Sequence, residues 1–160
     1  MLASSAADQA NALVRHLGDQ IGLPSLCLDP QGACMLLIAR RWRVSLVLDA
    51  ARDTLFLSCP VTVPAQLARI GPAAWASLLQ THHLGGPVPG ASIAVDPLGR
   101  VCVQQAMHLP SAPPAQILAT VETLIGRAMK WAELLAASAL EGMAPPEGLA
   151  PPARRLHTHV

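Results

Sequence analysis

The stretch "LDPQGACMLLIA" (Leu28–Ala39) decides the fold, and the chain nearly repeats it as "VDPLGRVCVQQA" (Val95–Ala106). Both read apolar residue, Asp, Pro, any residue, Gly, and then an apolar run. An Asp that opens a turn accepts hydrogen bonds from its own backbone, Pro fixes φ, and Gly tolerates φ > 0. A metal site would need more oxygen ligands nearby, and an array repeat would need a fixed period. We therefore interpret the echo as one turn used twice, each time before a strand.

The composition predicts one domain with an apolar surface that another chain covers. The 160 residues are 52% hydrophobic and only 13% charged, against a usual quarter of charged residues. A small domain needs polar cover, so this shortage of charge indicates a covered apolar surface. The net charge of +1 gives no general attraction to nucleic acid or lipid. No apolar run approaches the ~18 residues of a membrane span, and no export signal is visible at the start, so we expect a cytoplasmic protein that does not insert into membranes.

The periodicity of apolar residues predicts an α+β domain. Helical spacing appears in three segments, residues 7–20, 70–83 and 114–140. Short apolar runs bounded by turn residues predict strands at residues 25–28, 33–39, 43–48, 54–58, 91–95 and 100–105. The order is helix, three or four strands, helix, two strands, long helix, which is typical of helices packed on an antiparallel sheet. We expect a flexible N-terminus (1–6), this domain (7–140) and a disordered Pro-rich tail (141–160).

No motif in the sequence predicts catalysis. A Gly-x-Ser-x-Gly elbow, an HExxH helix and a P-loop are all missing from the sequence, as is any pair of carboxylates placed for acid–base work. The cysteines form no CxxC pair and lie in or beside apolar runs, which favours inert thiols over a zinc site or a nucleophile. His82 and His83 are adjacent, so on a helix they would point about 100° apart. We predict no catalytic residue, no metal and no cofactor; a Cys nucleophile with a His partner is the enzymatic alternative. The four cysteines are Cys27, Cys34, Cys59 and Cys102.

The one dense cluster of charge is "ARRWRV", with arginines from Arg40 to Arg43 around Trp42. It could hold an acidic partner or a nucleic-acid backbone. A solvated hairpin turn is the simpler interpretation, with arginines that block association of strand edges. One Phe, three Trp and no Tyr are too few aromatic residues for a base-stacking platform, so we expect no nucleic-acid partner.

The strand "CMLLI" (Cys34–Ile38) is apolar on both faces. One face can pack on the helices, but the other then needs a second covering. Another subunit or a peptide lying on the sheet could supply it.

This pattern resembles the class I chaperones of bacterial type III secretion, the Tir-chaperone or CesT-like family. That family has a Leu-Leu pair ending a helix, a polar loop, a strand, Asp, a turn, an apolar strand and then Leu-Pro. Leu78-Leu79, Ile93–Val95, Asp96, Val101–Val103 and Leu109-Pro110 take those places here. The resemblance covers roughly residues 7–140. It is carried by "IGLPSLCLDPQGACMLL" (21–37), "RVSLVLDAARDTLFLSCPV" (43–61), "WASLLQTHHLGGPVPGASIAVDPLGRVCVQQAMHLPS" (75–111) and "ILATVETLIGRAMKWAELL" (117–135).

The sequence departs from the family in two places. Such chaperones are usually acidic, whereas this chain carries a net charge of +1. The Leu-Leu helix is commonly followed by Asn, and Thr81-His82 stands there in this chain. With this charge, we do not expect the acidic surface that is usual in the family.

The resemblance implies a homodimer that binds the unfolded N-terminal segment of secreted effectors and keeps them soluble and competent for secretion. The secretion ATPase or the export apparatus is a further partner that it allows. A regulatory or scaffolding module that binds an apparatus component is the alternative. The implied client surface consists of Leu13, Leu17, Leu26, Leu28, Leu36 and Ile38. The implied dimer contact consists of Trp75, Leu78, Leu79, Ile93, Val101 and Val103. Each of these residues is equally credible as part of the core.

Overall fold

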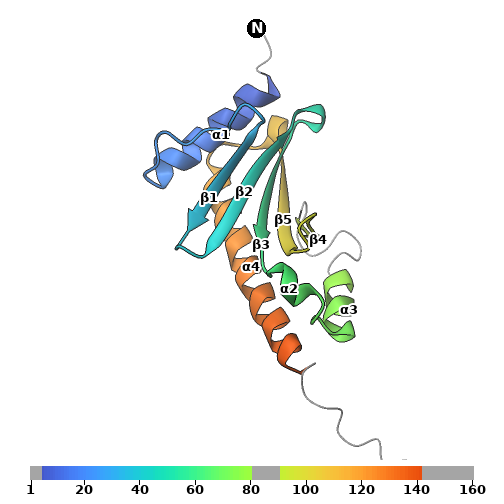
Figure 1. The fold of residues 1–160 in the computed structure, drawn as a ribbon. Coiled ribbons are helices and arrows are strands. Elements are labelled where there is room, and N and C mark those ends of the chain that lie inside the picture. Colours follow the sequence, from blue (N-terminus) through green and yellow to red (C-terminus); the bar gives the residue numbers. More distant parts are fainter. Residues whose placement is uncertain (1–4, 81–90, 142–160) are drawn as a thin grey trace, which may run out of the picture.

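The computed structural model describes residues 5–80 and 91–141. Within these residues, five strands and four α-helices follow one another (Figure 1). They are α1 (Ala6–Gln20), β1 (Ala33–Ile38), β2 (Trp42–Asp49), β3 (Thr54–Pro60), α2 (Pro64–Leu67), α3 (Pro72–Gln80), β4 (Ala91–Val95), β5 (Val101–His108) and α4 (Gln116–Glu141). Short 3₁₀ turns, η1 (Ala50–Arg52) and η3 (Leu109–Ser111), follow β2 and β5.

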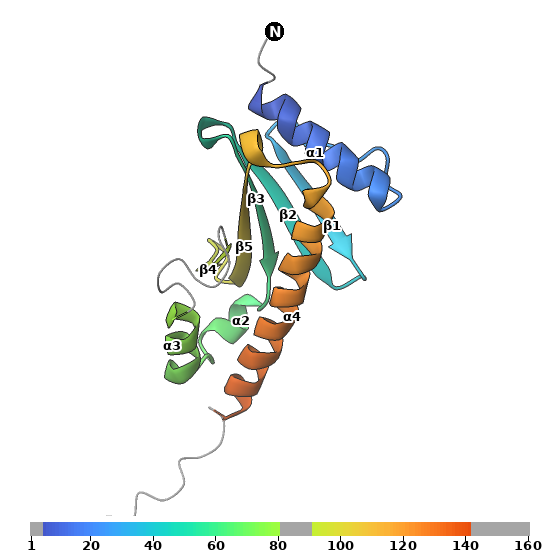
Figure 2. The same ribbon diagram turned by 180° about the vertical axis from the view of Figure 1, so that it is seen from behind.

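The strands form one antiparallel sheet in the order β1-β2-β3-β5-β4. Helices α1 and α4 lie behind this sheet in Figure 1 and in front of it in Figure 2, so both cover the same face. Helices α2 and α3 lie at one end of the sheet, where α4 extends past the strands (Figure 2). The α+β architecture predicted from the sequence is confirmed.

The main core lies between the sheet and the two long helices. Leu13 and Leu17 of α1, Leu46 of β2, Leu57 of β3 and Leu124 of α4 are all buried there. A smaller cluster at the other end of the sheet joins α3 to α4 through Ile70, Leu78, Val101 and Leu135. The molecule therefore has two layers, one of helices and one of strands, and within the described residues the second face of the sheet carries no helix.

The echoed sequence is one turn built twice. The Asp29 Oδ1 atom accepts hydrogen bonds from the backbone N–H groups of Gln31 (2.9 Å) and Ala33 (2.8 Å). The Asp96 Oδ1 atom accepts the equivalent bonds from Leu98 and Arg100, both 2.9 Å. The glycines of the two turns, Gly32 and Gly99, have φ of 78° and 72°, which only glycine adopts without strain. The interpretation as a turn is confirmed.

The predicted strand at residues 25–28 is wrong. The backbone N–H of Leu28 donates to the Asn11 side chain of α1 at 3.0 Å, so this segment is bonded to the helix and has no strand partner. Helix α2 was not predicted, since it has only four residues. Trp42 is not in the turn as predicted but is the first, buried residue of β2.

The start of the first predicted helix also differs. Helix α1 begins at Ala6, because Ser5 and Asp8 form a capping box that fixes the first turn. The predictions for the histidine pair at 82–83, the loop after it and the tail beyond Glu141 lie outside the described residues.

Candidate functional site

Strand β1 presents apolar side chains on both faces, as its sequence predicts. Leu36 points into the core and is 4% exposed, whereas its neighbours Met35 and Leu37 are 65% and 62% exposed. Val47 of β2, which is paired with Ala33, is exposed on the same outer face. Phe56 of β3 is paired with Val47 and is half-buried. We call Met35, Leu37, Val47 and Phe56 the outer patch. Large apolar side chains gathered on an uncovered sheet face indicate a docking surface.

The outer patch ends at an open strand edge. Strand β1 is the first strand of the sheet and pairs with β2 along one side. Its other side presents backbone N–H and C=O groups, which can bond to an added strand. An extended peptide could therefore contact both the backbone of β1 and the apolar side chains of the outer patch.

The predicted client residues are mostly core residues in the structure. Leu13, Leu17, Leu28 and Leu36 are buried between α1, the sheet and α4. A buried side chain cannot touch a client in this conformation, so for these four the core interpretation holds. Leu26 and Ile38 are partly buried against the same core.

On β1, the two predicted client residues, Leu36 and Ile38, lie on the inner face of the sheet. Ile38 is paired with Trp42 across a short turn, so even-numbered residues of β1 share the inner face with Trp42 and Val44. The odd-numbered residues Met35 and Leu37 face outward. The sequence of β2 indicates that Arg43 faces solvent. The residue of β1 paired with Arg43, which is Leu37, must then face solvent too, but this inference requires the register between the two strands.

A second apolar surface lies between α3 and β4. A cavity of about 190 Å³ there is lined by Trp75, Leu79, Ile93 and Val95, among others. Leu79 is 69% exposed and Val95 is also exposed, while Trp75 and Ile93 are half-buried. The remaining predicted dimer residues, Leu78, Val101 and Val103, are buried. The surface that another subunit could reach is therefore centred on Leu79.

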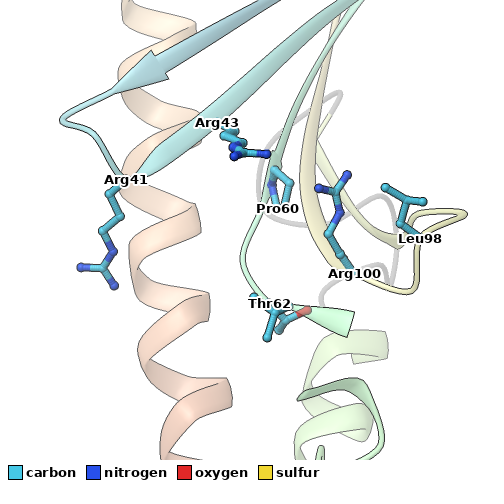
Figure 3. Close-up of a pocket in the computed structure, with 7 residues that line it drawn as sticks. Arg41, Arg43, Pro60, Thr62, Leu98 and Arg100 are labelled. Atoms are coloured by element: carbon cyan, nitrogen blue, oxygen red, sulfur yellow. The ribbon is translucent and has the colours of Figure 1, made fainter. Parts of the chain in front are cut away.

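Three arginines line a second cavity, of about 520 Å³, where β2 begins and β3 ends. Arg43 and Arg100 lie on either side of Pro60, whereas Arg41 extends away from them (Figure 3). Arg100 is paired with Asp96 at 2.6 Å. The guanidinium carbon of Arg41 lies 4.7 Å from the centre of the Trp42 ring, a cation–π distance.

The sequence of the chain matches the model of a known protein family. Residues 12–132 match the model of the Tir chaperone protein (CesT) family. The chain belongs to this family. The resemblance to class I type III secretion chaperones is thereby confirmed.

Solved structures share the chaperone's fold. A chain of the ExsC–ExsE complex aligns with a TM-score of 0.69 and 25% identity, covering 82% of this chaperone and 97% of that chain. A chain from the Yersinia pestis structure of the type III secretion chaperone SycH with a YscM2 fragment aligns with a TM-score of 0.63 and 15% identity. The alignment covers 76% of this chaperone and 98% of that chain. A chain of the HopA1–SchA chaperone–effector complex aligns with a TM-score of 0.61 and 17% identity. The alignment covers 78% of this chaperone and 94% of that chain. No protein with curated annotation matches the chaperone in sequence.

Two of the four thiols of the chaperone, Cys59 and Cys102, are buried, whereas Cys34 is half-buried and Cys27 is exposed. Burial, followed by the nearby Cys102, raises the pKa of Cys59 to about 11. Burial also raises the pKa values of Cys102 and Cys34. A raised pKa removes the thiolate that a nucleophile needs. Within the described part of the chaperone, no three His, Cys, Asp or Glu side chains are grouped to hold a metal ion, and none of its described helices is long and apolar enough to cross a membrane.

Proposed function

We propose that this chaperone works as a homodimer in the bacterial cytoplasm and binds the unfolded N-terminal segment of one or more secreted effectors. It keeps the client soluble and competent for secretion by covering apolar segments, without catalysis and without a cofactor. Membership of the Tir chaperone family supports this proposal. So does the shared fold with a chain of a chaperone–effector complex. The secretion ATPase or the export apparatus would receive the loaded complex.

The observation that carries the proposal is the uncovered outer patch beside the open edge of β1. Most of the surface of Met35 and Leu37 is exposed to water. Burying it against a client would stabilise the complex by about 25 cal/mol for each Å² of apolar area. A client strand laid along β1 would bond to its backbone and bury these side chains together. The affinity would come from backbone and apolar contacts, which unfolded segments of many sequences can supply.

The dimer contact is proposed at the surface around Leu79. Leu79 and Val95 are exposed there, beside the half-buried Trp75 and Ile93. This surface lies at the β4 side of the sheet, whereas the client surface lies at the β1 edge. Separate edges would let two subunits associate while each keeps its client surface free.

The test is affinity purification of the tagged chaperone co-expressed with the secreted proteins of its own bacterium. Three forms are compared: wild type, Met35→Glu on the outer patch and Leu134→Glu on the exposed side of α4. We expect wild type and Leu134→Glu to recover a client through its N-terminal segment, and Met35→Glu to lose at least most of it. Circular dichroism establishes that all three forms are folded.

Two results would contradict the proposal. Recovery of only apparatus components that are not themselves exported would favour a scaffolding module. Equal recovery of the client by Met35→Glu would place its binding elsewhere on the chaperone.

A further inference from the structure

The arginine-lined cavity has more positive charge than the structure around it neutralises. The ion pairs among the described residues are Arg52 with Asp49 and Arg100 with Asp96. Arg43 has no carboxylate partner in that part of the chain, and Arg41 lies over the Trp42 ring. A cation that points at a second cation across Pro60 (Figure 3) is stabilised when an anion comes between them.

The Asp96 turn holds Arg100 in place. The Asp96 Oδ2 atom accepts from Arg100 Nε at 2.7 Å and lies 2.6 Å from its Nη2 atom. Arg100 thereby commits part of its guanidinium to Asp96, and a guanidinium has five N–H donors. One fixed arginine and one unpaired arginine form a site that is partly assembled before any anion arrives.

The cavity continues the outer patch. Arg43 is paired with Leu37 across β1 and β2, so both side chains leave the sheet on the same face. On the other side of the cavity, Leu98 is 65% exposed and Val63 is also exposed. A segment that covers Met35 and Leu37 would pass Arg43 at its next contact.

We propose that the cavity binds an acidic side chain of the client, so that the chaperone selects an apolar strand segment with Asp or Glu at one end. This inference rests on the proposed function and adds the charge of the client to it. The carboxylate would bond to Arg43 and Arg100, with the apolar residues of the client on the outer patch. A phosphate backbone binds through a row of cations, whereas the chain carries a net charge of only +1. A peptide is therefore favoured over a nucleic acid as the ligand of the cavity.

The arginines would add selectivity more than strength. A solvent-exposed ion pair gives about 0.2–1 kcal/mol, or roughly 1.5- to 5-fold in affinity. Screening by salt reduces this gain, whereas apolar contacts are not weakened in this way. The acidic preference of the chaperone is therefore expected to be largest at low salt and to disappear at high salt, with the apolar binding retained.

The test uses an immobilised array of twelve-residue peptides with Val, Ile or Leu at alternate positions. Each sequence is made with two Glu, two Gln or two Lys at one end. Fluorescently labelled full-length chaperone is applied as wild type, Arg43→Gln, Arg43→Lys and, as the matched control, Arg15→Gln on the exposed side of α1. Wild type and Arg15→Gln should prefer the Glu peptides by about threefold or more at low salt. Arg43→Gln should bind Glu and Gln peptides equally, and Arg43→Lys should keep part of the preference.

The outcomes separate this inference from the proposed function. If wild type binds Glu and Gln peptides equally well, the acidic selection is wrong and the apolar client surface stands. If it binds none of the apolar peptides, the proposed function is contradicted and this inference with it. If Arg43→Gln keeps the full preference for Glu, the cavity is not the site. If Arg43→Gln weakens binding of a labelled oligonucleotide and leaves the peptide preference intact, the cavity binds nucleic acid and the proposal is overturned.

Discussion

Asp29 and Asp96 each accept hydrogen bonds from the backbone two and four residues ahead. The two turns differ in the residue that comes after the glycine. Arg100 stands there in the second turn and pairs with Asp96, whereas Ala33 takes the equivalent position in the first. A motif that the sequence shows twice therefore supports one plain turn and one turn that also positions an arginine.

The Asp96–Arg100 pair predicts a pH dependence of stability. Partial burial opposes ionisation of Asp96, but the hydrogen bonds and the charge of Arg100 outweigh it and lower the pKa of Asp96. A lowered folded pKa adds stability that is complete above the ordinary value of 3.8 and is lost as the pH falls through the folded value. We expect Asp96→Asn to be less stable than wild type at neutral pH, and the difference to shrink below about pH 4.

Urea unfolding followed by circular dichroism at several pH values measures this difference. Arg100→Gln removes the other partner and should shrink the pH dependence in the same way. A gap between wild type and Asp96→Asn that stays constant down to the lowest pH would contradict the assignment.

Cysteine reactivity tests the non-catalytic interpretation. The pKa of about 11 for Cys59, against an ordinary 9.0, lowers its thiolate fraction at pH 8 about 100-fold, and burial limits access further. We expect iodoacetamide to label the exposed Cys27 first under native conditions and Cys59 only after unfolding. Mass spectrometry of the labelled peptides gives the order. Fast labelling of Cys59 under native conditions would contradict the non-catalytic interpretation and favour the alternative of a Cys nucleophile.

Turn chemistry was the predictable part at this scale. The roles of Asp29, Asp96 and their glycines follow from local backbone geometry, which a short sequence determines. The contact between Arg100 and Asp96 depends on which way two side chains leave a turn. The unpaired state of Arg43 depends on strands that are distant in sequence, so the sequence could name the arginine cluster but not its cavity.

Strand β1 shows what an element adds to its residues. Leu36 and Leu37 are neighbours of the same type, yet one lies in the core and the other in solvent. Leu36→Ala should cost about 2–5 kcal/mol of the free energy of unfolding, whereas Leu37→Ala should change it by about 0.5 kcal/mol or less. Urea unfolding of the two variants measures this contrast. Equal losses would show that the outer face is also packed in the isolated protein.

Helices and strands were predicted correctly where the apolar periodicity extends over many residues. The prediction failed where a hydrogen bond to a residue distant in sequence determines the local structure. The strands from 43–48 onward and the three longer helices were predicted to within a few residues, because their apolar periods are clear. The segment at 25–28 is apolar but bonds to Asn11 of α1, a contact that its own sequence does not contain. The same limit explains why the sequence alone could not tell which residues of β1 face outward.

Within residues 5–80 and 91–141, the protein has two layers, and one face of its sheet carries no helix. The apolar side chains exposed on that face and around Leu79 agree with the high apolar and low charged content of the sequence. The apolar excess could be predicted from the sequence, but the proposal of separate client and dimer surfaces required the arrangement of the strands.

The proposed dimer contact predicts the effect of one substitution. Leu79→Glu places a charge on an exposed apolar surface, so it should leave the fold intact and convert the dimer to a monomer, because burying an unpaired charge is costly. Light scattering coupled to size-exclusion chromatography measures the mass, with Leu134→Glu as the control that remains dimeric. A wild type that is monomeric, or a Leu79→Glu variant that stays dimeric, would contradict this contact.

Hydrogen exchange of the chaperone with and without its purified exported client tests the central claim most directly. The account predicts that backbone amides of β1, at Ala33–Ile38, become protected when the N-terminal segment of the client binds, while those on the exposed side of α4 do not change. Protection confined to α4, or no change in β1 with the client bound, would contradict it.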